Sequence, residues 1–506
     1  MYEDQFPKKK FSFAEPPPPV EEKDILRTID TQALVVGAGL GGLFAATRLR
    51  EYGYEVLLIE KGSSFSGRGG QFGVAWSDLM EEKGVKNDLR EVVRQWIARS
   101  GNRVNEELIW LFANRSGEAM NWFLPKARAA GFTPVLLDCG YSTYPYKEFP
   151  GIHTFPNETG IRGNMVSGII YQDAINQGVE VMFHTAGYQL VMDEGRVAGI
   201  IAKTPDGYIR IMARNGVVLA TGDIGGDPEM LRAYAPDALK TCDTQYVPRG
   251  LNTGDGHKMA LWVGAAMAEE VFPIMMHPQH YAWQSFFFLF VNQNGCRFMN
   301  EDTYVQGKAT AILGQPGGPW GYSIFDSKWP EQVKDSLQYG GGLFYGNPGR
   351  RHGMEWVSAE PQMAIDNAMK NDCGWQADSL EDLADKMGIP KDAFMETVKR
   401  YNHLASQKDD CDFGKRSELL HPIESPPFYA LKFGTVLLCI VGGLEIDTKI
   451  RVLDNNKNPI PGLYAVGDTT GGMYGHEYVT TILGNSHGRA MTWGYIAAET
   501  IHMLDR

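Results

Sequence analysis

The sequence contains few cysteines, and none of them stands in a pair that would mark a metal, haem or iron–sulfur site. It has no C-x-x-C or C-x-x-C-H motif, the usual sign of zinc ribbons, attached haem and iron–sulfur clusters. Isolated cysteines are most often inert residues, partly or fully buried. The six cysteines are Cys139, Cys242, Cys296, Cys373, Cys411 and Cys439.

An excess of basic residues is also absent. The chain has 48 Lys and Arg residues against 61 Asp and Glu residues, and its formal net charge is −13. Binding to nucleic acid requires a basic surface that neutralises phosphates. This charge balance therefore argues against a nucleic-acid partner.

Long hydrophobic runs are missing as well. The longest apolar stretches, near FFFLFV and VLLCIV, are far shorter than the about 20 residues that span a bilayer. The N-terminal stretch has basic residues without a following apolar region, and it has no twin-arginine pair. We therefore expect no secretory signal, no transmembrane segment and a cytoplasmic location.

The composition is that of an ordinary globular protein with a large core. The chain has 506 residues, of which 43% are hydrophobic and 22% are charged. A chain of this length predicts two or three domains, or one large domain with an insertion.

A glycine-rich turn between a strand and a helix opens the chain. The apolar run at residues 32–36 is followed by GAGLGG, by a helical pattern and by a second strand that ends in Glu60. In such a unit Gly37 permits the turn, Gly39 lets a pyrophosphate approach the backbone, and Gly42 lets the helix pack close to the sheet. A carboxylate at the end of the second strand accepts hydrogen bonds from a ribose diol. The predicted contacts of this segment are Gly37, Gly39, Gly41, Gly42, Glu60 and Lys61.

Two later segments favour FAD over NAD as the dinucleotide. Residues 216–226 form a predicted strand that ends in Ala220-Thr221-Gly222, and residues 462–472 form another that ends in Gly467-Asp468. The carboxylate of Asp468, in the second of these segments, can hold a ribitol hydroxyl of FAD. All three segments occur in this order over most of the chain, and we therefore predict an FAD-binding protein.

At this point the chain resembles the flavoprotein family of fumarate reductases and succinate dehydrogenases, which also includes 3-ketosteroid dehydrogenases and urocanate reductases. The resemblance runs from about residue 31 to the end of the chain. Its carriers are LVVGAGLGGLFAATRLREYGYEVLLIEKG, VVLATGDIGGDPEML, NTGDGHKMALWVGA, NQNGCRFMNE, GGLEIDTKIRVLDNNKNPIPGLYAVGDTTGG and LGNSHGRAMTWGYIAAE.

The resemblance implies an α/β fold in which a split, Rossmann-like FAD-binding domain carries an inserted α+β cap domain. We expect an N-terminal arm at 1–30, the first FAD-binding segment at 31–250, the substrate-capping domain at 251–425 and the second FAD-binding segment at 426–506. Residues 181–213 have the alternating pattern of strands that flank such a flavin domain.

The resemblance also places two loops at the flavin ring. Small residues after the second strand let backbone N–H groups approach the flavin ring. Arg68 in this loop departs from the sequence that is usual in the family. The start of the final helix would direct its positive end toward the flavin. An ordinary helix cap by Asn485 or Ser486 is compatible with that role. The residues predicted at the ring are Ser66, Gly67, Gly69, Gly70, Gly484, Asn485 and Ser486.

Most features of the dicarboxylate reductases of this family are missing. The position of their histidine before Gly442-Gly443 is apolar, and the loop before Gly484 lacks their arginine. Tyr304 and Val305 stand near the place of their proton-donating arginine. Only the cap histidine has a counterpart, His277. Carboxylates are bound by arginine forks, so we do not expect this site to hold fumarate well.

Tyrosines suit a neutral carbonyl compound instead. A tyrosine donates one neutral hydrogen bond and presents an apolar body. In the ketosteroid branch of the family, tyrosines polarise the substrate carbonyl and move the proton. We therefore expect hydride transfer between flavin N5 and the β-carbon of an apolar α,β-unsaturated ketone, a hydrophobic small molecule. The candidate catalytic residues are Tyr304, Tyr478, Tyr474 and His277.

Other functions are also compatible with the sequence. With no haem or cluster motif, electrons should come from or go to a separate donor or acceptor. One alternative is a reductase of carboxylate substrates whose anchors are Arg68, Arg297 or Arg489. Another is a flavin electron-transfer subunit without its own substrate, although the large aromatic cap argues against it. A third is an amine or alcohol oxidase on a similar FAD domain, which NQNGCRFMNE disfavours.

Overall fold

A computed structural model gives the structure of the chain, and it describes residues 11–67, 70–139, 143–156, 165–282, 287–336, 339 and 358–506. Its helices are α1 Leu40–Glu51, α2 Asp78–Glu82, α3 Leu89–Arg99, α4 Glu106–Ala129, α5 Met165–Asn176, α6 Pro228–Tyr234, α7 Asp255–Trp262, α8 Val305–Leu313, α9 Trp329–Ser336, α10 Ala359–Lys370, α11 Leu380–Met387, α12 Lys391–Gln407 and α13 Asn485–Leu504.

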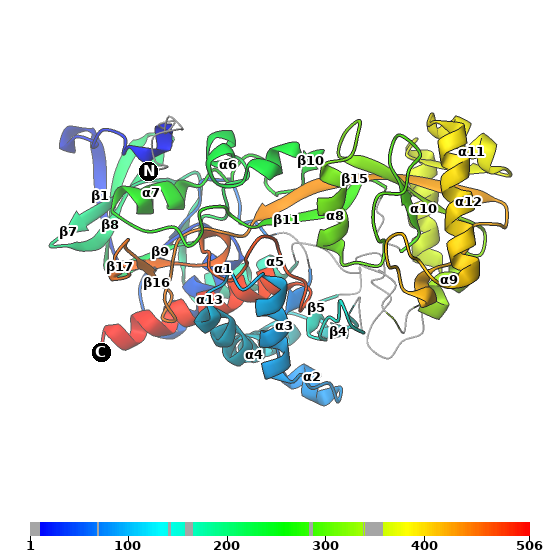
Figure 1. Ribbon diagram of the computed structural model, residues 1–506. Helices are drawn as coiled ribbons and strands as arrows, with labels where there is room; N and C mark the ends of the chain where they lie inside the picture. Colours follow the sequence, from blue (N-terminus) through cyan, green and yellow to red (C-terminus); the bar gives the residue numbers. More distant parts are fainter. Residues whose placement is uncertain are drawn as a thin grey trace.

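The first sheet joins the two ends of the chain (Figure 1). Its order is β16-β17-β9-β1-β2-β6, and β8 pairs with both β9 and β7. Strands β17, β9, β1, β2 and β6 run parallel, whereas β16, β7 and β8 pair antiparallel with their neighbours. The strands are β1 Ile25–Val36, β2 Val56–Ile59, β6 Glu180–Met182, β7 Ala186–Asp193, β8 Arg196–Thr204, β9 Gly207–Leu219, β16 Arg451–Leu453 and β17 Pro459–Ala465.

The second sheet is built around one long strand, β15, which pairs with four others. Figure 1 shows β15 running from the side of the first sheet to the group of helices α9 to α12. Its strands are β10 Asp243–Thr244, β11 Ile274–Tyr281, β12 Leu289–Val291, β13 Trp320–Phe325, β14 Gly374–Ala377 and β15 Phe428–Ile440. A small third sheet contains β3 Phe72–Gly73, β4 Val135–Leu137 and β5 Ile152–Thr154.

The predicted α/β class is therefore confirmed, with a parallel sheet at the predicted glycine turn. The alternating strands expected at 181–213 are found as β6 to β9. Two positions bear on the expected domain bounds, which stay a prediction. Strand β1 begins at Ile25, inside the segment expected as an arm, and β15 pairs with strands of the second sheet before the chain returns to the first sheet at β16.

Helices α1 and α13, from the two ends of the chain, pack on each other beside the first sheet. Helix α13 contacts α1 and α4. A Cβ atom on Gly494 would lie 2.5 Å from the carbonyl oxygen of Gly41, so the two backbones approach closely at this point. The C-terminal helix is thus held directly on the helix that follows the glycine-rich turn.

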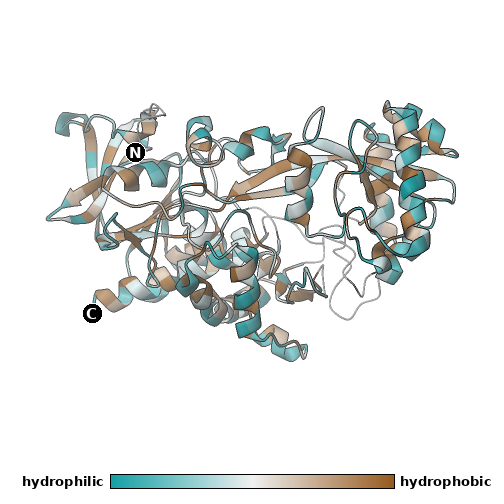
Figure 2. Cartoon of the chain, in the orientation of Figure 1, coloured by the Kyte–Doolittle hydropathy of each residue, from teal (hydrophilic) through white to brown (hydrophobic). Residues whose placement is uncertain are grey.

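Helices α11 and α12 cover the second sheet through one apolar face each. Helix α12 buries Phe394, Val398 and Tyr401, which recur at intervals of three or four residues. Figure 2 shows both hydrophilic and hydrophobic residues on these helices. Within the described ranges, no helix combines the length and the hydrophobicity that a membrane span requires.

Gly42→Ala provides a test of the packing at the glycine-rich turn. A Cβ atom there would lie 2.0 Å from the carbonyl oxygen of Gly37. This oxygen belongs to the backbone, so relieving the clash would distort the turn. We expect the free energy of unfolding to fall by at least about 1–3 kcal/mol, the usual cost of overpacking. Chemical denaturation of the purified protein measures this change.

Gly168→Ala is the matched control. Gly168 lies in α5, and nothing stands within 4 Å of the position that its Cβ atom would take. Alanine favours a helix over glycine by up to about 1 kcal/mol, so this variant should be at least as stable as the parent. Equal stability of the two alanine variants would contradict the packing described for Gly42.

Candidate active site

The candidate site lies at the carboxyl edge of the first sheet. Val36 of β1 is level with Ile59 of β2 and Leu219 of β9, and Leu219 is level with Ala465 of β17. The segments that follow these strands therefore meet at one edge. In open parallel sheets, ligands bind outside the carboxyl ends of the strands.

A cavity at this edge brings together most of the residues predicted to contact the cofactor. Its lining includes Gly37, Gly39, Gly41, Glu60, Lys61, Ser66, Gly67, Gly70, Ala220, Thr221, Gly222, Gly467, Asp468, Gly484 and Ser486. Gly42 and Asn485 are outside this lining. Arg68 and Gly69 lie outside the described residues.

Glycine is required at position 37, where the chain turns after β1 and passes close to the end of β9. Gly37 has a φ of 111°, and its N–H donates to the carbonyl oxygen of Ile59 at 2.8 Å. A Cβ atom on Gly37 would lie 2.2 Å from the carbonyl oxygen of Ala220. Only a residue without a side chain lets the turn adopt this conformation and approach the neighbouring strand end.

The carboxylate of Glu60 is fixed by the turn that it faces. One oxygen accepts from the N–H of Ala38 at 2.8 Å, and the other accepts from the N–H of Gly62 at 2.7 Å. The adjacent Lys61 donates to Asp255 at 2.7 Å and to Thr253 at 2.8 Å. Lys61 therefore lines the cavity with its charge balanced by Asp255, which lines the cavity too.

Asn485 holds the loop that precedes α13. Its amide donates to the carbonyl oxygens of Val479 at 2.8 Å and Ile482 at 2.6 Å. Gly484 starts the helix with a φ of 75°, a conformation that favours glycine. The structure thus gives Asn485 contacts within the protein, while Gly484 and Ser486 border the cavity.

Tyr478 is the one predicted catalytic residue that lines the cavity. Its hydroxyl oxygen accepts from the N–H of Ser486 at 3.4 Å. Tyr474 lies behind it, with ring centroids 5.4 Å apart. The Tyr474 hydroxyl donates to Oδ1 of Asn485 at 2.5 Å. The two tyrosines thus form one layer beneath the start of α13.

Tyr304 and His277 lie outside the cavity lining. The Tyr304 hydroxyl donates to the carboxylate of Glu477, which also accepts from Thr310 at 3.2 Å. Burial and the Glu477 charge hold the pKa of Tyr304 well above its usual range. His277 is fully buried on β11, and its Nδ1 lies 3.2 Å from Nε2 of Gln279.

Several residues that line the cavity were not predicted from the sequence. Met275 and Gln279 flank His277 on β11, and Leu438 and Cys439 lie near the end of β15. Alternation along β11 gives no reliable signal here, because the pairing of β11 with β15 shifts register on both sides of His277. The side chains Met275, Gln279, Leu438 and Cys439 give this part of the wall a neutral character.

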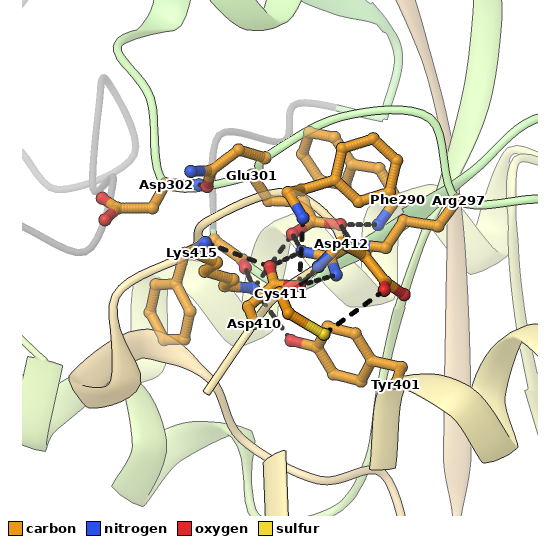
Figure 3. A network of polar contacts seen from close by, with 12 residues as sticks. Phe290, Arg297, Glu301, Asp302, Tyr401, Asp410, Cys411, Asp412 and Lys415 are labelled. Carbon is orange, nitrogen blue, oxygen red and sulfur yellow. Dashed lines mark hydrogen bonds and ion pairs between the residues drawn. The ribbon is translucent and has the colours of Figure 1, made fainter. Parts of the chain in front are cut away.

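Two of the arginines considered as anchors for a carboxylate are held by protein carboxylates. Arg297 donates to Glu301 at 2.8 Å and to Asp410 at 2.7 Å in a buried network that also includes Lys415 (Figure 3). Arg489 pairs with Asp468 at 2.5 Å. Neither arginine is among the cavity-lining residues.

The cavity fits FAD by three observations. The glycine turn of β1 leaves a cradle that a Cβ atom would fill, the Glu60 carboxylate ends the second strand, and β9 and β17 bring two further segments to the same edge. Such a turn and acid suit a pyrophosphate and a ribose. The wall formed by Gly484, Ser486 and Tyr478 supplies a second end for a longer ligand.

Comparisons with known proteins agree with this fit. A family model described as FAD binding domain matches residues 32–479. Fumarate reductase (cytochrome) of Shewanella frigidimarina is 28% identical over 488 residues, which cover 93% of this chain and 76% of that protein. A 3-oxosteroid 1-dehydrogenase of Mycolicibacterium smegmatis is 27% identical over 581 aligned positions, covering 92% of this chain and 96% of that protein.

A solved structure has the same fold. The 3-ketosteroid-Δ4-(5α)-dehydrogenase of Rhodococcus jostii RHA1, in complex with 4-androstene-3,17-dione, superposes with a TM-score of 0.70 at 23% identity. The match covers 94% of this chain and 97% of that chain.

Replacing Glu60 tests the dinucleotide end of the cavity. We expect Glu60→Ala to weaken FAD binding by about tenfold or more, because a ribose would lose a charged acceptor worth about 1.5–3 kcal/mol. Titration of the apoprotein with FAD measures this affinity. Glu55→Ala is the control, because Glu55 is exposed and directly precedes β2, the strand that Glu60 follows. Equal affinities of both variants would contradict the assignment.

A buried carboxyl beside the cavity predicts a pH dependence of stability. Asp223 accepts from the N–H groups of Ile440 at 2.5 Å and Gly225 at 3.2 Å. Burial, and then the nearby Asp468, raise the pKa of Asp223 to about 7. In the unfolded chain an aspartate has a pKa of about 3.9. Between these values the folded protein binds the extra proton, so the stability contributed by Asp223 falls as the pH rises.

We therefore expect the parent protein to lose more stability than Asp223→Asn between pH 4 and 8, by on the order of a few kcal/mol. Chemical denaturation of both proteins across this range gives the difference directly. Parallel pH profiles would show that Asp223 does not hold the proton.

Proposed function

The chain belongs to the family of flavoproteins with this FAD binding domain and is an FAD-dependent oxidoreductase, and from this premise we propose that it acts on a carbon–carbon bond beside a neutral carbonyl group. The substrate would be an apolar α,β-unsaturated ketone or its saturated counterpart. One observation carries this proposal: the cavity wall at Tyr478 is formed with Met275, Leu438 and Cys439, which carry no charge.

Two of the three arginines considered as carboxylate anchors support a neutral substrate. Arg297 and Arg489 are engaged by carboxylates of the protein. A substrate carboxylate would have to compete with those ion pairs, and an unpaired buried charge is costly. A ketone needs only one hydrogen-bond donor and an apolar surface, which a tyrosine and the residues around it supply.

FAD, when bound, supplies or accepts the hydride at its redox-active ring. We assign the polarising role to Tyr478, whose O–H would donate to the substrate carbonyl. Its oxygen already accepts from the N–H of Ser486, and such a chain of hydrogen bonds strengthens the O–H as a donor. As charge moves onto the carbonyl oxygen, this donor stabilises enolate character.

The other candidates act from behind this wall. Tyr474 supports Tyr478 by ring contact and fixes Asn485 through its hydroxyl. Tyr304 lies outside the cavity lining and donates to Glu477, the residue next to Tyr478, so we assign Tyr304 to holding this loop in place. His277 supports Gln279 at the cavity lining.

The remaining predictions form part of the proposal. The glycine-rich turn, Glu60 and Asp468 would hold FAD within a Rossmann-like domain that is split in sequence, and the second sheet with its helices would act as an inserted cap over the substrate. Electrons would be exchanged with a separate donor or acceptor.

Rapid mixing of the reduced protein with two acceptors tests the substrate class. The bound FAD is reduced without oxygen and mixed with a 3-keto-4-ene steroid or with fumarate, and the return of flavin absorbance is followed. We expect fast reoxidation by the steroid and slow reoxidation by fumarate. The opposite order would contradict a site for neutral ketones.

Tyr478→Phe tests the polarising hydroxyl. We expect at least a tenfold slower reoxidation by the ketone, because one donor to a developing oxyanion is lost. Tyr429→Phe is the control, since Tyr429 lies on β15 of the second sheet and its ring stacks on Phe325 at 5.2 Å. Full activity of Tyr478→Phe would remove Tyr478 from the mechanism.

A further inference from the structure

Arg489 places a positive charge inside the protein, directly behind the cavity wall. It lies in the first turns of α13, and its side chain has no solvent exposure. Its Nη2 donates to Oδ1 of Asp468 at 2.5 Å, and its Nη1 donates to the carbonyl oxygens of Val441 at 3.3 Å and Thr470 at 3.2 Å. The guanidinium thus links the loop after β17, the turn after β15 and α13.

This burial is poorly explained by stability alone. Removing a guanidinium from water costs several kcal/mol, and an apolar side chain of similar volume often stabilises a protein more. Among the described residues, the Nε–H of Arg489 has no hydrogen-bond partner, so the charge is not fully satisfied. Within the described ranges, the carboxylate that pairs with Arg489 is that of Asp468.

Asp468 connects this charge to the cavity. Its carboxylate borders the cavity and retains 22% side-chain exposure, whereas Arg489 has none. Oδ1 of Asp468 accepts both from Arg489 and from the hydroxyl of Ser486 at 3.2 Å. These two donors fix the rotamer of the carboxylate from the protein side. No hydrogen bond to Oδ2 is found within the part of the chain that the structure describes.

We propose that Arg489 is a positioning residue for FAD, acting through Asp468. It holds the carboxylate in the orientation that leaves one oxygen for the cofactor, and it balances a negative charge that would otherwise stand alone beside the flavin. An uncompensated anion there would oppose reduction of FAD, because reduction adds negative charge to the ring. Arg489 therefore raises both the affinity for FAD and its midpoint potential. The proposal rests on the cofactor and is independent of the substrate.

A second contact connects the same charge with the tyrosines. The guanidinium carbon lies 5.0 Å from the ring centroid of Tyr474, within the range of a cation–π interaction. Burial lowers the pKa of Arg489, but the neighbouring Tyr474 and Asp468 outweigh it and raise that pKa above its ordinary value. Arg489 therefore keeps its positive charge, as arginines do in proteins.

Arg489→Met tests the proposal by two measurements on the folded protein: the affinity of the apoprotein for FAD, and the midpoint potential of bound FAD against reference dyes. We expect FAD binding to weaken by about tenfold to a hundredfold, the usual effect of breaking a buried charge pair, and the potential to become more negative.

Arg297→Met is the matched control. Arg297 is a second buried arginine with carboxylate partners, in the network that Figure 3 shows in the second part of the chain. Its removal should lower the melting temperature while leaving the FAD affinity and potential unchanged. If Arg489→Met behaves in the same way, Arg489 is merely structural and the proposal is overturned.

Two further variants separate charge from position. In Arg489→Met with Asp468→Asn, the lone anion is absent, so the potential should return toward that of the parent while FAD binding stays weak. Asp468→Asn alone leaves the cation unbalanced, so the potential should rise above that of the parent. This single variant tests the pair even if Arg489→Met does not fold, since an unchanged or lower potential would overturn the proposal.

Discussion

The carboxyl ends of four parallel strands stop at one level, and the rest of the structure depends on that alignment. The register brings Val36, Ile59, Leu219 and Ala465 to the same edge. Between the first and third of these strand ends the backbone approach is so close that Gly37 faces the carbonyl oxygen of Ala220 without room for a Cβ atom. The cavity, its acid and its later contacts all follow from this edge.

The sequence predicted this edge well because its signals are local. A glycine turn, an acid after a strand and a second glycine-acid step each depend on a few neighbouring residues, and the cavity brings Gly37, Glu60 and Asp468 together as expected. The substrate wall depends on distant pairings instead. Met275 and Leu438 meet there because β11 pairs with β15, a register that no local pattern specifies. For the same reason Tyr304 could not be placed, since its partner Glu477 is 173 positions away in the sequence.

Two buried arginines show how differently a charge can be accommodated. Arg297 lies among Glu301, Asp410 and Lys415, a set that balances itself within one part of the fold (Figure 3). Arg489 shares the carboxylate of Asp468 with the cavity wall. The first arrangement organises the protein interior, while the second makes the interior charge available to whatever the cavity binds.

The return of the chain to its first sheet has a consequence for biosynthesis. The cavity needs the glycine-rich turn near residue 37 and also β17 and the start of α13, near residues 465 and 485. A nascent chain that still lacks residues 459–486 therefore has only one side of the cavity. Both sides of the cavity exist only after the segments near residues 465 and 485 have been synthesised and have paired with the first sheet.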